Sequence, residues 1–144
     1  MIKTIALVAH DARKKELVEW VKYNSKELSK YYLYATGTTA SMLGTLGLNV
    51  SPLLSGPLGG DQQIGAMIAE GKVDVLIFFC DNLAVQWHQN DVSALGRLAS
   101  LYNIAYATNR TTADMILTSP LVSDREYERI IPPAIEQYKN RFNK

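Results

Sequence analysis

The strongest constraint on the fold is an almost wholly apolar segment from Val73 to Phe79. A short run of this composition, bounded by turn residues, is typical of a central β-strand that is covered on both faces. We therefore expect this segment to lie in the middle of a layered structure, with helices packed above and below it.

Other short apolar segments alternate with segments of helical character along the whole chain. Further strands are predicted at Ile5–Ala9, Tyr31–Ala35, Asn49–Leu54 and Ile104–Ala107. Helices are predicted over residues 14–29, 39–46, 62–70, 91–102, 112–117 and 133–142. Strands that alternate with helices imply parallel pairing and right-handed crossovers. We predict one α/β domain over residues 1–144: three layers, with a doubly wound, mostly parallel five-stranded sheet and helices on both faces.

Composition excludes several classes of protein. The formal net charge is only +1, from 15 basic and 14 acidic residues, so neither nucleic acid nor a membrane surface is an expected partner. The single cysteine, Cys80, excludes an intrachain disulfide and fits a reducing cytoplasm. Met1 leads directly into the first strand without a signal peptide, and the run Val75–Cys80 is too short to cross a bilayer. A small cytoplasmic domain is predicted.

Polar or glycine-rich clusters follow each predicted strand. In a parallel sheet such clusters meet at the carboxyl edge, where α/β folds bind their ligands. The clusters are His10-Asp11, Thr36-Gly37-Thr38-Thr39, Ser55 to Asp61, Cys80-Asp81-Asn82 with His88 and Asp91 further on, and Thr108-Asn109. We expect one site that draws on all of them.

Two of these clusters have the chemistry of a phosphate cradle. Residues 36–39 offer hydroxyls and main-chain amides at the start of a helix, which favours an anion, although a simple cap and turn would look the same. Ser55-Gly56 and Gly59-Gly60 add a second loop with exposed amides. Neither loop matches the P-loop or the dinucleotide fingerprint, which disfavours ATP and NAD. Lys14 is either a positive partner of the anion or a solvated lysine.

The reactive candidates are carboxylates and imidazoles at the same edge. Asp61 lies where a helix N-terminus would keep it ionised, either as a reactive group or as a plain cap. The same edge also carries His10, Asp11, Asp81, His88 and Asp91, and the chain has no other histidine. A metal site is a further alternative, but the spacings match no zinc motif and we expect no metal and no cofactor. Cys80 ends an apolar strand and is expected to be a buried small side chain rather than a nucleophile.

These motifs resemble those of the methylglyoxal synthase family. The resemblance covers residues 5–114 in unbroken order, and its most specific part is the block Ser-Gly-Pro-Leu-Gly-Gly-Asp-Gln-Gln from Ser55 to Gln63. Leu7–Asp11, Tyr34–Thr39 and Ala107–Asn109 match as well. The resemblance implies elimination of phosphate from dihydroxyacetone phosphate, which gives methylglyoxal and inorganic phosphate without a cofactor. It also implies a homohexamer, and the shared cradle predicts inhibition by phosphate.

The resemblance also implies a role for each candidate residue. Asp61 corresponds to the general base and His88 to the histidine that hydrogen-bonds the substrate oxygens. Asp81 and Asp91 correspond to supporting carboxylates. Substrate and phosphate binding is implied for His10, Asp11, Lys14, Thr36, Gly37, Thr38, Thr39, Ser55 and Gly56. Arg141 is the nearest match to a C-terminal arginine that reaches a neighbouring subunit's site in the family.

Two departures and one competing function stay open at this point. Asn82 and Asn90 stand where the family has prolines, which puts the rigidity of the loop in doubt more than the reaction. The same fold also serves as a regulatory domain that binds a phosphorylated effector in larger enzymes. Such a sensor needs the cradle but no base, so the presence of both Asp61 and His88 favours an enzyme.

Overall fold

Five parallel strands form the centre of the molecule. The computed structural model describes residues 1–83 and 89–143. The strands are β1 (Thr4–Ala9), β2 (Tyr32–Thr36), β3 (Val50–Leu53), β4 (Val75–Phe79) and β5 (Ala105–Ala107), in the sheet order β3-β2-β1-β4-β5. All four neighbouring pairs are parallel. The predicted doubly wound sheet is confirmed, and each predicted strand is present within two residues of its expected bounds.

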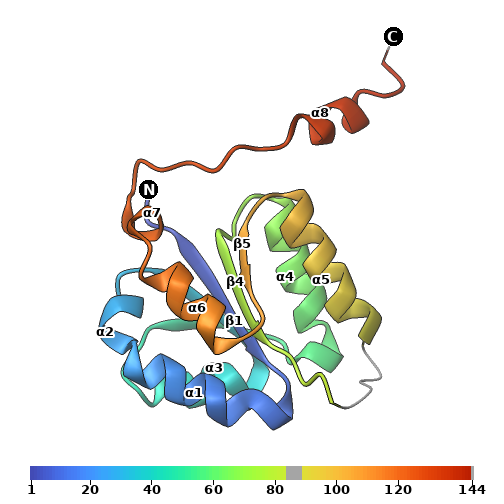
Figure 1. Ribbon diagram of the computed structural model, residues 1–144. Helices are drawn as coiled ribbons and strands as arrows, with labels where there is room; N and C mark the ends of the chain where they lie inside the picture. Colours follow the sequence, from blue (N-terminus) through green and yellow to red (C-terminus); the bar gives the residue numbers. More distant parts are fainter. Residues whose placement is uncertain (84–88, 144) are drawn as a thin grey trace.

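Helices cover both faces of this sheet, and each face has its own core (Figure 1). One face packs against α1 (Lys14–Tyr23), α2 (Ser25–Leu28), α3 (Gly37–Gly44), α6 (Arg110–Leu117) and α7 (Pro120–Ser123). The other face packs against α4 (Gly60–Ala69) and α5 (Gln89–Leu101). Two 3₁₀ turns, η1 (Asp11–Arg13) and η2 (Gly56–Leu58), lie in the loops after β1 and β3, and α8 (Pro133–Lys139) follows near the C-terminus.

Strand β4 divides the two cores, as its apolar sequence predicts. All five of its residues are buried. Val75, Ile77 and Phe79 face the α1 side, whereas Leu76 and Phe78 face the α4 side. Because successive side chains of a strand point to opposite faces, a strand covered on both faces must be apolar throughout.

The prediction of one continuous helix over residues 14–29 is wrong. It is divided into α1 and α2 at Asn24, whose φ of −105° and ψ of 16° leave the helical region. The amide nitrogen Nδ2 and the main-chain N–H of Asn24 both donate to the carbonyl of Trp20, at 2.9 and 3.1 Å. These bonds satisfy a carbonyl at the end of α1 and terminate the helix there.

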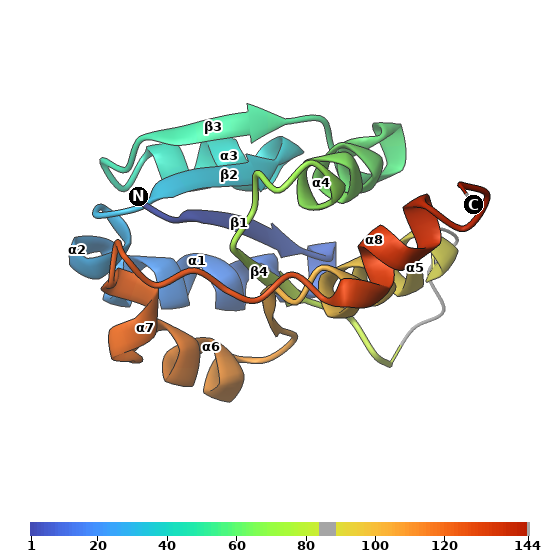
Figure 2. The ribbon, with the colours of Figure 1, turned by 90° about the horizontal axis from the view of Figure 1, so that it is seen from above.

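The C-terminal segment crosses the amino end of the sheet before it reaches α8 (Figures 1 and 2). Arg129 attaches it, with Nη1 2.6 Å from Oδ1 of Asp74 and Nε donating to the carbonyl of Tyr102 at 3.3 Å. Asn103 Nδ2 donates to the carbonyl of Ile130 at 2.9 Å. Within residues 1–83 and 89–143, no helix is both long enough and apolar enough to span a membrane.

Candidate active site

A cavity of about 420 Å³ opens at the carboxyl edge of the sheet, where the predicted clusters meet. Ten of the predicted site residues line it: His10, Asp11, Lys14, Thr36, Gly37, Thr38, Ser55, Gly56, Asp61 and Asp81. They come from the ends of β1, β2 and β4 and from the loop after β3, stretches far apart in the sequence. A second cavity, of about 580 Å³, lies at the opposite end of the sheet beneath the C-terminal segment.

Asp61 is the most deeply buried charged group of this cavity. It lies in the first turn of α4 and is only 2% exposed, so the helix dipole stabilises a negative charge there. The carboxylate lies against the main chain of Gly56, where a Cβ would be 3.2 Å from Oδ1. The glycine thus allows the η2 loop to lie directly beside the carboxylate, with no side chain between them.

The two loops of the predicted phosphate cradle touch each other. Gly37 begins α3 with a φ of +39°, and a Cβ on it would lie 2.8 Å from Cβ of Ser55. Only glycine fits both the backbone conformation and the space. The close approach brings the amides at the N-terminus of α3 next to Ser55, and free helical N–H groups of this kind bind anions.

Lys14 carries a positive charge beside the predicted cradle. Its Nζ donates to Thr38 Oγ1 at 2.7 Å and forms an ion pair with Asp11 Oδ1 at 2.7 Å. The Lys14 side chain is 23% exposed, whereas that of Asp11 is 96% exposed. A hydroxyl of the predicted cradle therefore holds the ammonium group at the N-terminus of α3. This position favours a lysine that pairs with a bound anion over a solvated lysine.

His10 is buried and linked to the end of β4. Its ring packs edge-on against Phe78, with the centroids 5.1 Å apart. Its main-chain N–H donates to the carbonyl of Phe79 at 3.1 Å. The main-chain N–H of Asp81 donates to His10 Nδ1 at 2.8 Å, so the imidazole proton resides on Nε2.

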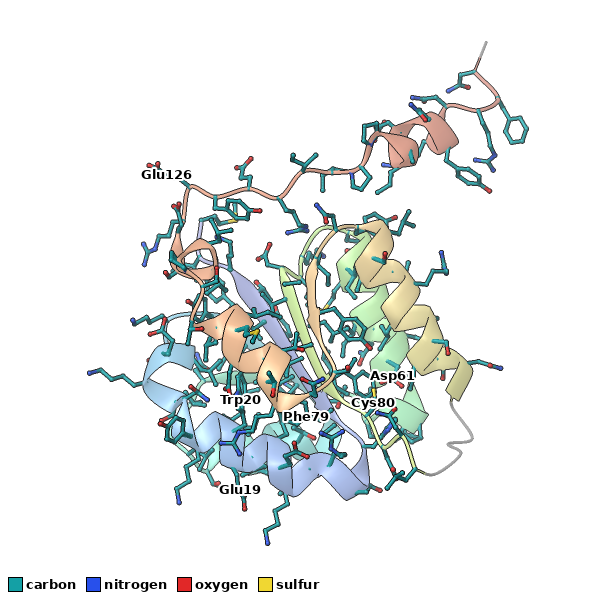
Figure 3. All side chains as sticks on the ribbon, in the orientation of Figure 1. Glu19, Trp20, Asp61, Phe79, Cys80 and Glu126 are labelled. Atoms are coloured by element: carbon teal, nitrogen blue, oxygen red, sulfur yellow. The ribbon has the colours of Figure 1, made fainter. Side chains whose placement is uncertain are left out.

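Cys80 lies beside this arrangement but is not suited to be a nucleophile. Cys80 directly follows β4 and interacts electrostatically with Asp61 of α4 (Figure 3). Burial raises the pKa of the Cys80 thiol to about 11; the positive charge of Arg13 opposes this shift and the negative charge of Asp61 adds to it. A thiol of such high pKa holds very little thiolate near neutral pH. The tyrosine Tyr106 is similarly affected, since burial raises its pKa to about 12.

Two predicted site residues are not among the described residues that line the cavity, and a third lies outside the described residues. Thr39 is fully buried in α3, and Asp91 lies in the first turn of α5, so neither is among the lining residues. His88 lies outside the described residues. Asn82 and Asn90, at the positions of the missing prolines, are both exposed.

Arg13 is the neighbour of the site that sequence reasoning missed. Its guanidinium binds the carbonyl of Cys80 at 2.6 Å and Glu16 through two further hydrogen bonds. No local pattern distinguishes it within the basic run of residues 13–15, because its partner Cys80, directly after β4, is 67 positions away. Only the pairing of β1 with β4 brings the two together.

The donor set of the cavity suits an anion. Among residues 1–83 and 89–143, no three His, Cys, Asp or Glu side chains form a group that could hold a metal ion. The cavity instead combines one ammonium group, hydroxyls from Thr36, Thr38 and Ser55, and a helix N-terminus. Donors of this kind suit a phosphate, and the carboxylate of Asp61 lies in the same cavity.

Comparison with known proteins places this arrangement in a family. A family model described as MGS-like domain matches residues 16–108. Methylglyoxal synthase of Proteus mirabilis (strain HI4320) is 55% identical over 94% of this chain and 89% of its own length. That of Pseudoalteromonas atlantica (strain T6c / ATCC BAA-1087) is 55% identical over 92% of this chain and 98% of its own. The crystal structure of methylglyoxal synthase from Elizabethkingia anophelis NUHP1 has a TM-score of 0.87 at 44% identity, covering 99% of this chain and 91% of that one. The chain therefore belongs to the methylglyoxal synthase family.

Proposed function

We propose that this protein is a methylglyoxal synthase, which eliminates phosphate from dihydroxyacetone phosphate to give methylglyoxal and inorganic phosphate. The observation that carries this proposal is the buried carboxylate of Asp61, which shares one cavity with the phosphate cradle of Lys14, Thr38 and Ser55. The cavity's 420 Å³ suits a substrate as small as a triose phosphate. The family membership supports the same reaction.

The reaction balances without a cofactor. The carboxylate of Asp61 removes a proton from the hydroxymethyl carbon next to the carbonyl, and the C–H electron pair forms an enediolate. The electrons of the enediolate then expel phosphate from the other carbon, and the C–O bond to the phosphate breaks. The resulting enol takes a proton at its methylene carbon, loses the proton of its hydroxyl group and becomes methylglyoxal. A positioned general base of this kind contributes about 10²–10⁴-fold.

The remaining residues stabilise the charges that develop. The N–H of His10 Nε2 suits the enediolate oxygen, because a donor aimed at a developing oxyanion lowers the barrier. Lys14 and the N-terminus of α3 would stabilise the departing phosphate. By the resemblance, His88 would hydrogen-bond the substrate oxygens, and Asp81 and Asp91 would be supporting carboxylates. Thr36, Gly37, Thr39 and Gly56 keep the roles of cradle residues.

The competing function is a regulatory domain that binds a phosphorylated effector. It would use the same cradle and would have no need for a carboxylate beside it. Asp61 is 2% exposed, and a buried carboxylate beside a bound anion weakens the binding of that anion, a penalty that a role as general base would explain. This burial favours the enzyme.

The test supplies purified full-length protein with dihydroxyacetone phosphate and measures methylglyoxal and phosphate in the same sample. We expect equal amounts of both products, and a loss of at least about 100-fold in kcat for Asp61→Asn. Asp124→Asn, a matched change on the C-terminal segment, should retain activity. Phosphate release without methylglyoxal would indicate a phosphatase. Binding without turnover would indicate the regulatory domain.

The quaternary structure and the location belong to the same proposal. The resemblance implies a homohexamer. We expect its C-terminal segment to contact a neighbour, because that segment exposes Ile130 and Phe142 at 78% and 82%. Sedimentation velocity of the full chain measures the assembly, and a monomer at micromolar concentration would contradict the homohexamer.

A cytoplasmic location fits the single reduced Cys80.

A further inference from the structure

One peptide group at the end of β4 is held at both of its ends. It joins Cys80 to Asp81: its carbonyl accepts from Arg13 Nη1 at 2.6 Å, and its N–H donates to His10 Nδ1 at 2.8 Å. His10 and Arg13, both in the connection between β1 and α1, thus bind the two polar ends of the same peptide group. This arrangement links a cation outside the cavity lining to an imidazole inside it.

Arg13 is fixed in the orientation that this contact needs. Its Nε and Nη2 bind the two carboxylate oxygens of Glu16 at 2.7 and 3.0 Å, so the planar guanidinium cannot rotate. The cation also lies over the ring of Phe79, 5.3 Å from its centroid. The hydrogen bond to Glu16 raises the pKa of Arg13, which keeps the group charged. The side chain is 24% exposed, so solvent screens it only in part.

A charged donor on a peptide carbonyl strengthens the N–H at the other end of the same peptide. Electron density is drawn toward the carbonyl oxygen, and hydrogen bonds in such a chain reinforce one another. The N–H of Asp81 is therefore a better donor to His10 Nδ1 than an ordinary amide. Because a peptide N–H can only donate, Nδ1 must accept, and the ring proton is kept on Nε2.

We propose that Arg13 is a positioning residue for the reaction: through the Cys80–Asp81 peptide it holds His10 as the tautomer that carries its proton on Nε2. His10 lines the cavity, so the Nε2–H tautomer is a hydrogen-bond donor for a substrate oxygen. The contribution to rate rests on the proposed function; the control of the tautomer does not. Arg13 touches no substrate and acts only through its neighbours.

The first experiment reads the tautomer directly, without substrate. Protein labelled with ¹⁵N-histidine gives long-range proton–nitrogen spectra in which each ring nitrogen has a shift set by its protonation. The chain has two histidines, so a His10→Gln sample assigns the signals. We expect pure Nε2–H signals for His10 in the unaltered protein and a mixture of tautomers in Arg13→Met. Arg97→Met, a matched change at an exposed position of α5, should leave the spectrum unaltered.

The second experiment separates kcat from KM. For Arg13→Met we expect kcat to fall about 10-fold to 100-fold, as for the loss of a charged hydrogen bond, with KM within about 3-fold because the phosphate cradle is intact. Arg13→Lys, which keeps a charged donor, should restore part of kcat and most of the Nε2–H signal. Unaltered His10 signals in Arg13→Met would overturn the proposal, and so would a fall in thermal stability with kcat unaltered.

Failure of the Arg13 proposal can be distinguished from failure of the proposed function. If Arg13→Met does not fold, Arg13→Gln, which also removes the positive charge, takes its place, and a retained pure Nε2–H signal in that variant would overturn the proposal. If the unaltered protein makes no methylglyoxal, the proposed function fails. The ¹⁵N spectra then still decide whether Arg13 sets the tautomer.

Discussion

Gly60 lies so close to Leu54 that a Cβ on Gly60 would be 1.9 Å from the carbonyl oxygen of Leu54. This contact folds the loop between β3 and α4 tightly and places Asp61 at the cavity. Gly60→Ala must therefore displace the backbone, and we expect the free energy of unfolding to fall by at least about 2 kcal/mol. The same displacement should lower kcat. Urea denaturation and steady-state kinetics measure the two effects.

The matched control for this substitution is Gly44→Ala. Gly44 ends α3, and nothing lies within 4 Å of the position a Cβ would take. Alanine is the better helix former, so stability should stay constant or rise by up to about 1 kcal/mol. Equal losses in the two variants would mean that the Leu54 contact is not what requires glycine at position 60.

Removing the ammonium group of the cradle should weaken substrate binding. For Lys14→Met we expect KM for dihydroxyacetone phosphate to rise about 10-fold to 100-fold, the effect of one charged hydrogen bond. The inhibition constant of inorganic phosphate should rise with it, because both anions use the same contact. Lys15→Met, an exposed neighbour in α1, serves as control. An inhibition constant that is unaltered in Lys14→Met would place the phosphate elsewhere.

The thiol of Cys80 should resist alkylation in the folded protein. A pKa of about 11 in place of the usual 9.0 lowers the thiolate fraction at pH 8 about 100-fold, and burial slows the reaction further. Mass spectrometry after iodoacetamide treatment should find native protein unmodified and urea-unfolded protein fully modified. Equal labelling of the two states would show that the thiol is accessible.

The raised pKa of Cys80 makes the free energy of unfolding depend on pH in the alkaline range. The unfolded thiol loses its proton near pH 9, whereas the folded thiol keeps it until about pH 11. The stabilisation is fully present below pH 9 and is lost as the pH rises toward 11. Urea denaturation at pH 8 and pH 10.5 should therefore show a smaller alkaline decrease for Cys80→Ala than for the unaltered protein. An identical decrease would assign the effect to other groups, such as Tyr31 and Tyr106.

Breaking the attachment of the C-terminal segment should loosen it without affecting the site. Arg129→Gln removes the contact with Asp74, and we expect faster amide hydrogen exchange across residues 124–131 with about 1 kcal/mol less stability. Arg125→Gln, on the same segment, is the control. Because Arg129 lies at the amino end of the sheet, kcat should change by less than about 2-fold. A larger loss of activity would couple the segment to catalysis.

A metal chelator should leave turnover unaltered. The proposed elimination uses a carboxylate base and hydrogen-bond donors, all of which belong to the chain. We expect the rate after dialysis against EDTA to equal the rate before it. Loss of activity that added Mg²⁺ or Zn²⁺ restores would contradict the prediction that no cofactor is needed.

Much of the fold follows from the sequence because parallel strands carry a strong local signal. The apolar run at Val73–Phe79 predicts β4, and Gly71, with a φ of +77°, stops α4 as expected. The interruption at Asn24 was missed, because the apolar spacing continues past it while its side chain binds the carbonyl of Trp20. The short helix α7 was also missed, since a single turn has too few residues to show a period.

The site residues also differ in whether the sequence alone could identify them. Asp61 and the 36–39 cluster could be selected because each lies in a motif that is contiguous in the sequence. Arg13 could not, because its role depends on a carbonyl that only the pairing of β1 with β4 brings within reach. Thr39 is part of the cradle motif, yet helical geometry turns it into the core, where it is fully buried.

The cavity is built from residues 8–14, 36–38, 55–61 and 78–81, so no single segment of the chain holds half of it. An anion in this cavity would contact the ends of β1, β2 and β4 and would bind only when all three are in register. Ligand binding and folding are therefore linked by mass action. At a concentration 100 times its dissociation constant, such an anion adds about 2.7 kcal/mol to stability. The supply of triose phosphate and phosphate would thus set the lifetime of the folded chain as well as its rate of turnover.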